Sequence, residues 1–122
     1  MARHNELGKT GEQLAVSFLL KKGYKILECN WRYSRAEVDI IAMDSDTLVC
    51  VEVKARSSNM WGSPAMSVTP KKEKLLADAL SVYMERIDHQ WEVRFDVLAV
   101  VIINEQHHEI THFQDAFFPG LH

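Results

Sequence analysis

Four charged residues stand inside two apolar segments of the chain. The segment EVDIIAM carries Glu37 and Asp39, and the segment LVCVEVK carries Glu52 and Lys54. Moving a charged group out of water is costly unless that group is paired or binds a metal. Carboxylates at such positions therefore indicate a metal site.

The turn between these two segments decides which residues face each other. A hairpin that turns at residues 44–47 places Asp39 opposite Glu52. The same register places Glu37 opposite Lys54, and the alternation of strand side chains puts all four on one face. Two carboxylates directly opposite each other repel unless they share a cation. Carboxylate oxygens suit Mg²⁺ or Mn²⁺, which keep several waters and accept phosphate oxygens as further ligands.

Two further residues extend this predicted site. Lys54 can hold a water or stabilise charge that develops on a phosphate. Glu12 lies on the flank of the apolar stripe of a predicted first helix, where it can add an outer carboxylate. The alternative is a solvated hairpin end, in which a surface ion pair contributes at most about 1 kcal/mol. The register match between Asp39 and Glu52 favours the metal site.

The hydrophobic pattern predicts the elements that position these residues. Apolar residues at helical spacing, followed by Gly23, predict a helix over residues 7–22. Thr69 and Pro70 suit the N-cap and first position of a second helix that continues to Ile87. Strands are predicted at residues 24–33, 37–43, 48–54 and 93–103, with a possible edge strand at 108–113. The order α-β-β-β-α-β predicts an α/β fold, a mixed β-sheet flanked by helices.

Length and composition limit the class of protein. The chain has 122 residues, of which 47% are hydrophobic and 25% charged, as expected for a single domain over residues 1–122. The longest apolar run, residues 97–103, is far below the roughly 20 residues of a membrane helix. The polar start lacks a signal-peptide apolar region, so we expect a cytoplasmic protein without membrane contact. Cys29 and Cys50 have no CxxC spacing, and we interpret both as small buried or half-buried residues, with a structural disulfide as the less favoured alternative.

The motifs together resemble a known nuclease superfamily. An Asp on one strand, Glu-x-Lys on the next and a Glu in the first helix are similar to the PD-(D/E)xK superfamily, with its restriction-endonuclease-like fold. Within it, residues 8–118 resemble the YraN-like family of small bacterial proteins, which are similar to archaeal Holliday junction resolvases. The matching stretches are GKTGEQLA, NWRY, AEVDII, VEVKAR, WGSP, residues 71–74 and RFDVLAV.

This resemblance implies a specific activity. The implied reaction is hydrolysis of DNA phosphodiester bonds with Mg²⁺ or Mn²⁺, at branched or structured DNA, by a protein that can act as a homodimer. The implied metal ligands are Asp39, Glu52 and Glu12, with Lys54 activating the water and Glu37 in a supporting role. Ala36 stands where the family usually has Gly, which raises the question whether a bulge or a positive φ is needed there.

Basic residues near the motifs are candidates for contacts with DNA. Lys71 and Lys72 open the second helix, where the helix dipole disfavours cations unless an anion such as a phosphate binds. Solvated lysines are an equally good explanation. Arg32, Arg35 and Arg56 flank the charged end of the hairpin, where they either line a phosphate track or form surface ion pairs.

Three other features carry weaker expectations. Trp61 either stacks on a splayed base or closes the core, and core packing is slightly favoured. Arg94 and Asp96 share a strand face and brace either each other or the site. The histidines of the tail lack a zinc-type partner set, and an exposed edge strand explains them more simply. These histidines are His107, His108 and His112.

Two functions remain compatible with the sequence. The first is a metal-dependent nuclease that uses the paired carboxylates. The alternative is a non-catalytic module on the same fold that binds nucleic acid or a protein partner through the basic residues. Formal net charge does not decide between them, because residues 1–74 carry +3 and residues 75–122 carry −6.

Overall fold

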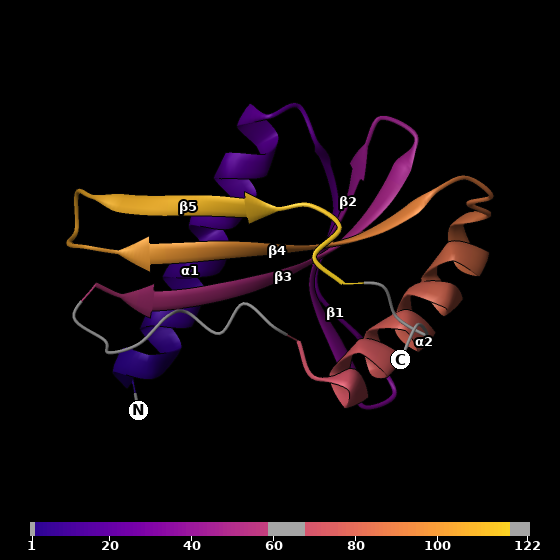
Figure 1. Cartoon of the computed structure of the whole chain (residues 1–122), viewed down its shortest axis with the longest axis horizontal. Helices are drawn as coiled ribbons and strands as arrows, with labels where there is room; N and C mark the ends of the chain where they lie inside the picture. Colours follow the sequence, from indigo (N-terminus) through magenta and orange to yellow (C-terminus); the bar gives the residue numbers. More distant parts are fainter. Residues whose placement is uncertain (1, 59–67, 118–122) are drawn as a thin grey trace.

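The computed structural model describes residues 2–58 and 68–117, with side chains from residue 7 onward. Helices and strands follow in the order α-β-β-β-α-β-β (Figure 1). Their bounds are α1 Ala2–Lys21, β1 Lys25–Tyr33, β2 Ala36–Asp44, β3 Thr47–Ser57, α2 Pro70–Ile87, β4 Val93–Ile102 and β5 His108–Phe113. The predicted α/β fold is confirmed, and the tail forms the edge strand predicted at residues 108–113.

One mixed sheet contains all these strands, in the order β1-β2-β3-β4-β5. Neighbouring strands are antiparallel except for β3 and β4, which are parallel. A parallel pair needs a long crossover, and the crossover between β3 and β4 carries α2. The long apolar strand β4 lies inside the sheet between β3 and β5.

The twisted sheet separates two apolar clusters. Figure 1 shows α1 behind β3, β4 and β5, and α2 beside the end formed by β1 and β2. The cluster on the α1 face includes Ala15, Leu19, Ile40, Val49, Val51 and Leu98. The cluster on the α2 face includes Val38, Ile41, Cys50, Leu76, Leu80 and Val97. Because strand side chains alternate, Glu52 shares the α2 face with Cys50.

Local sequence signals set the helix ends. Gly23, at φ +91°, follows α1, and the Tyr24 N–H donates to Leu19 O (N···O 3.0 Å). Thr69 caps α2 as predicted, because its hydroxyl accepts from the Lys72 N–H (3.2 Å) and Pro70 follows. Within the described part of the chain, neither helix is long and apolar enough to cross a membrane.

The cysteine prediction holds for one of the two residues. Both cysteines are free, and Cys50 is fully buried in the cluster under α2. Cys29 is exposed, so its prediction as a buried or half-buried thiol is wrong. Cys29 belongs to β1, which forms an edge of the sheet and has a neighbouring strand on one side only.

Helix α1 packs closely against β3 at Gly11. A Cβ atom at this position would lie 2.5 Å from Ala55 Cβ. We therefore expect Gly11→Ala to lower the free energy of unfolding by roughly 1–3 kcal/mol, measured by urea denaturation. Gly8→Ala is the matched control, because a Cβ there meets nothing within 4 Å and should stabilise the helix by up to about 1 kcal/mol. A stabilising effect of both substitutions would contradict the close approach.

Candidate metal centre between β2 and β3

The hairpin register predicted from the turn is confirmed between Asp44–Thr47 and Ile40–Val51. Beyond Ile40 the backbone ladder between β2 and β3 ends, while β2 stays paired with β1 and β3 stays paired with β4. The two strands therefore part at the position that the sequence assigned to the paired carboxylates.

Side-chain hydrogen bonds replace the backbone ladder in this gap. The Asp39 backbone N–H donates to Glu52 Oε2 (3.4 Å), and the Val53 backbone N–H donates to Asp39 Oδ2 (2.8 Å). Each carboxylate thus uses one oxygen to bind the backbone of the opposite strand. The other oxygens, Asp39 Oδ1 and Glu52 Oε1, remain for a cation.

Glu52 is almost completely buried and is paired with a lysine of α2. Its side chain is 1% exposed, and Oε1 lies 2.8 Å from Lys72 Nζ. The two groups carry opposite charges and lie within ion-pair distance, so the ammonium group is the cation that neutralises this carboxylate. Burial alone would lower the pKa of Lys72, but the adjacent Glu52 outweighs burial and the pKa is raised.

Asp39 resists ionisation in this environment. Burial, and then the charge of Glu52, raise its pKa from 3.8 to about 7. Glu12 adds to the rise, whereas the Val53 N–H and Lys72 oppose it. A strongly shifted carboxyl beside a second carboxylate is typical of a functional site, because a bound cation would relieve the repulsion.

Asp39→Asn should stabilise the metal-free fold. The folded-state pKa lies above the unfolded value, so wild-type stability falls as the pH rises from about 4 to about 7. Asn avoids this loss and keeps an acceptor for the Val53 N–H, so the gain should be small near pH 4 and roughly 1–3 kcal/mol above pH 7. Chemical denaturation in EDTA at several pH values measures it. Destabilisation by the same amount at every pH would contradict the repulsion.

The pair of carboxylates fits a divalent cation that keeps part of its water shell. Within residues 7–58 and 68–117, no group of three or more His, Cys, Asp and Glu side chains is arranged to hold a metal ion. Mg²⁺ is usually held by one or two carboxylates, with waters and substrate phosphate oxygens as the other ligands. Asp39 Oδ1 and Glu52 Oε1 are donors of the kind that Mg²⁺ and Mn²⁺ prefer.

Glu12 reaches this region from the other side of the sheet. It lines a pocket together with Lys9, Cys29, Asn30 and Asp39. Its charge acts on Asp39, but it does not complete a group of three ligands within the described residues. Glu12 as a metal ligand therefore stays a prediction.

Asn30 belongs to the same pocket and had no predicted role in the site. It lies opposite Asp39, between the pairs Cys29–Ile40 and Trp31–Val38, and has φ +53°. Asn tolerates this left-handed backbone better than most residues, and that tolerance is the signal in the sequence that could have identified it.

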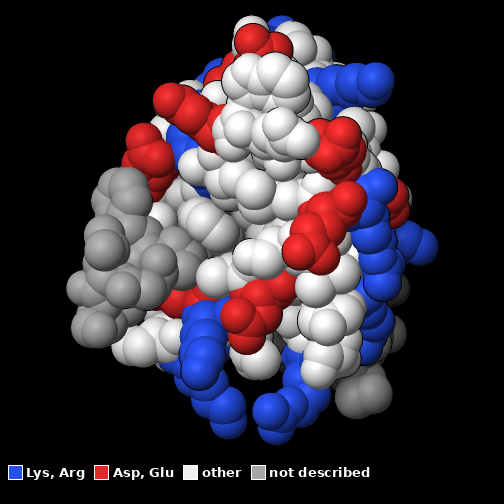
Figure 2. Space-filling view, turned by 90° about the vertical axis from the view of Figure 1, so that its right-hand side faces the viewer, with Lys and Arg blue, Asp and Glu red and all other residues white. Residues whose placement is uncertain are grey.

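A second pocket lies on the α2 side of Asp39 and is lined by three cations. Arg35, Lys71 and Lys72 surround it together with Glu37, Asp39 and Thr69. Figure 2 views the end of the molecule that carries α2, and basic side chains gather around acidic atoms along its lower edge. The structure therefore brings together three of the predicted DNA contacts beside the carboxylates.

The predicted pair of Glu37 and Lys54 does not form. Glu37 instead pairs with Arg32 of β1 (3.0 Å), because β2 follows β1 after it leaves β3. The side chains of Arg32 and Glu37 are 78% and 39% exposed, so this ion pair contributes about 1 kcal/mol or less. Lys54 lies half-buried on the face of β3 that carries Glu52, and Lys72 is the lysine that contacts the carboxylate.

Three other residues were singled out near the motif, and the structure places two of them. Arg56 is half-buried at the end of β3, where its Nη1 donates to Ser57 O (3.5 Å). Ala36 is 6% exposed in the extended strand β2 without a positive φ, and its methyl group belongs to the cluster under α2, so the backbone there accommodates Ala. Trp61 and the WGSP loop lie outside the described residues.

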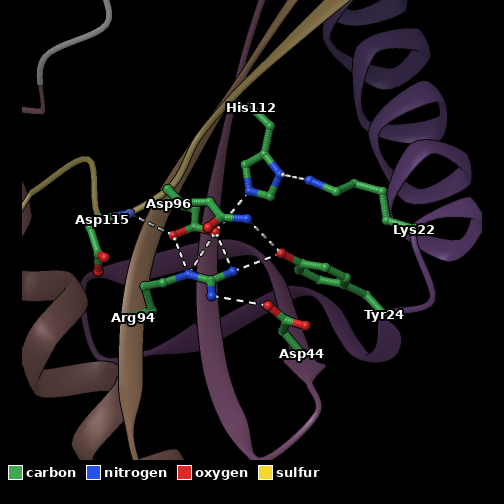
Figure 3. Close-up of polar contacts among 8 residues, drawn as sticks. Lys22, Tyr24, Asp44, Arg94, Asp96, His112 and Asp115 are labelled. Atoms are coloured by element: carbon green, nitrogen blue, oxygen red, sulfur yellow. Dashed lines mark hydrogen bonds and ion pairs between the residues drawn. The ribbon is translucent and has the colours of Figure 1, made fainter.

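Arg94 and Asp96 brace each other and not the carboxylate site (Figure 3). Arg94 Nε donates to Asp96 Oδ1 (2.9 Å), and its other nitrogens reach Asp44 Oδ2 (3.0 Å) and Tyr24 Oη (2.7 Å). Their strand neighbours on β3 are residues of the α1 face. This network therefore lies on the opposite face of the sheet from Glu52.

His112 is buried, so the prediction of an exposed histidine is wrong for this residue. Its side chain is 5% exposed, and Nε2 lies 2.8 Å from Asp96 Oδ2. Lys22 Nζ lies 2.7 Å from Nδ1, and the ring meets Phe18 of α1 edge-on. Helix α1 covers this part of β5, whereas His107 and His108 are exposed as predicted.

Comparison with known proteins places the chain in a family. Residues 11–100, which include both carboxylates and Lys72, match the profile of the Uncharacterised protein family UPF0102. A UPF0102 protein of Flavobacterium psychrophilum is 51% identical over 118 residues, covering 97% of this chain and 98% of the relative. A UPF0102 protein of Thermodesulfovibrio yellowstonii is 45% identical over 113 residues, covering 93% and 96%. The YraN-like resemblance is thereby confirmed, and the chain belongs to family UPF0102.

Proposed function

We propose that this protein is a divalent-metal-dependent nuclease that hydrolyses DNA phosphodiester bonds, with branched or structured DNA as its substrate. One observation carries the proposal. Asp39 and Glu52 occupy the gap between β2 and β3, directly beside a pocket lined by Arg35, Lys71 and Lys72. Metal-assisted phosphodiester hydrolysis needs carboxylates for the cation and basic groups for the phosphates.

Each residue has a role in this proposal. Asp39 and Glu52 hold Mg²⁺ or Mn²⁺, which when bound supplies an activated water and stabilises charge on the phosphate. Arg35 and Lys71 bind backbone phosphates at the N-terminus of α2. Lys54 orients the attacking water from the same face of β3.

A second candidate function is binding of structured nucleic acid without cleavage. The observation in its favour is the contact between Lys72 and Glu52, which neutralises the buried carboxylate without a metal. On this alternative, affinity for DNA falls as the salt concentration rises, and no product forms.

One experiment separates the two functions. Labelled four-way junctions and linear duplexes of the same sequence are incubated with the protein in Mg²⁺, Mn²⁺ or EDTA, and binding and cleavage are measured in parallel. The nuclease proposal expects cleavage with metal, none in EDTA, and preference for the junction. Salt-sensitive binding without cleavage of either DNA would favour the binding module, and cleavage that persists in EDTA would contradict a metal mechanism.

A further inference from the structure

We propose that Lys72 is the resident counter-ion of the carboxylate site, and that a divalent cation must displace its ammonium group before Glu52 can bind the metal. The inference rests on the proposed metal site. It adds to that site a residue that controls when the metal can bind, in addition to any contact of Lys72 with DNA.

The two partners differ in their freedom to move. The Glu52 side chain is 1% exposed and accepts the Asp39 backbone N–H, so the carboxylate stays in place. The Lys72 side chain is 44% exposed, and its long stem can carry the ammonium group into water. The Lys72 backbone is fixed at the start of α2 by Thr69, so only the side chain needs to move.

The contact is also of a kind that a metal can replace. Glu52 Oε1 is buried, and its contact with the ammonium group is an ion pair of opposite unit charges. A divalent cation carries twice the charge of Lys72 and can bind Asp39 and Glu52 together. After the exchange, the buried Glu52 and the half-buried Asp39 both have a positive partner.

The pocket beside the site gives the displaced lysine a second partner. Arg35, Lys71 and Lys72 line it together with the carboxylates Glu37 and Asp39, so three cations are available to a phosphate bound there. A DNA phosphate would hold the Lys72 ammonium group away from Glu52 and thereby open the carboxylate to metal. Without DNA, part of the metal affinity is lost to competition with Lys72.

The test is a calorimetric titration of Mn²⁺ into the full chain without DNA, for the wild type, Lys72→Met and Lys74→Met. Removing the competing ammonium group should tighten Mn²⁺ binding by roughly tenfold or more in Lys72→Met. Lys74 is exposed on the same helix and does not line the pocket, so Lys74→Met removes the same charge and should bind like the wild type. Lys72→Arg keeps a cation beside Glu52 and should bind no tighter than the wild type.

Each outcome has a distinct meaning. Equal Mn²⁺ affinity in the wild type and Lys72→Met would overturn the displacement while leaving the metal site in place. Absence of binding in both would overturn the displacement and the metal site together. Tighter binding by Lys72→Arg would also overturn the displacement. If Lys72→Met folds only when Mn²⁺ is present, as followed by thermal unfolding, the proposal is supported, because the metal then replaces the missing cation.

Discussion

Glu52→Gln should lower metal-dependent DNA cleavage by at least about 10³-fold, and Asp39→Asn should do the same. Both substitutions keep the size of the side chain and remove a charge that holds the cation. The two residues act as one unit in the gap between β2 and β3, so the double variant should lose little more activity than either single variant. Initial cleavage rates at saturating Mg²⁺ measure the loss.

Asp46→Asn is the matched control for these variants. Asp46 is an exposed carboxylate in the turn of the same hairpin, so its substitution removes an equal charge without touching the gap. Its rate should stay close to that of the wild type. Cleavage by Glu52→Gln at the wild-type rate would exclude the carboxylate pair as the catalytic site and would point to a contaminating nuclease.

Asp96→Ala should destabilise the fold by roughly 3–5 kcal/mol, because it removes a fully buried carboxylate and leaves the half-buried Arg94 with Asp44 as its remaining ion-pair partner. Asp96 also accepts from the Asp115 backbone N–H (3.1 Å), so the chain after β5 loses a contact as well. Denaturant unfolding near neutral pH measures the effect. Asp78→Asn on the exposed face of α2 is the control and should change stability by less than about 0.5 kcal/mol.

The contribution of Asp96 should disappear in acid. Burial alone would raise its pKa, but hydrogen bonds from His112 and Arg94 outweigh burial and lower it below 3.8. A lowered carboxyl pKa adds stability that is complete above the unfolded value and is lost as the pH falls through the folded value. The difference between wild type and Asp96→Ala should therefore shrink below about pH 4. A constant difference down to pH 2 would contradict the ionic origin of the stabilisation.

The sequence predicted the register of β2 against β3, because the hairpin turn sets this register. Pairing of Met43 with Leu48 follows from the turn, and the register extends to Ile40 and Val51 as expected. The turn could not show that the ladder ends before Asp39, because there a side chain bonds to the backbone of the other strand, and backbone register does not encode such a bond. Once β2 and β3 part, Glu37 of β2 pairs with Arg32 of the neighbouring β1, which a hairpin considered alone cannot show.

The other differences between the predictions and the structure arise from contacts between segments that are distant in the sequence. Lys72 was a candidate for DNA, but its pairing with Glu52 depends on how α2 packs against β2, a choice that local pattern does not encode. The segment HEITHF places His112 on the same face as Ile110, which packs in the cluster under α1. This face of β5 is covered because α1 packs over it. The sequence pattern of an edge strand is the same whether a helix covers the face or not, so the pattern could not predict the burial of His112.

The central claim is that the gap between β2 and β3 is a metal site, and a Mn²⁺ titration of the wild type beside Asp39→Asn tests it most directly. Calorimetry should show one bound ion per wild-type chain, with binding lost in Asp39→Asn, because Asn removes one of the two charged ligands. Equal binding by both proteins would place the ion elsewhere. Binding by neither the wild type nor Lys72→Met would contradict the metal site itself.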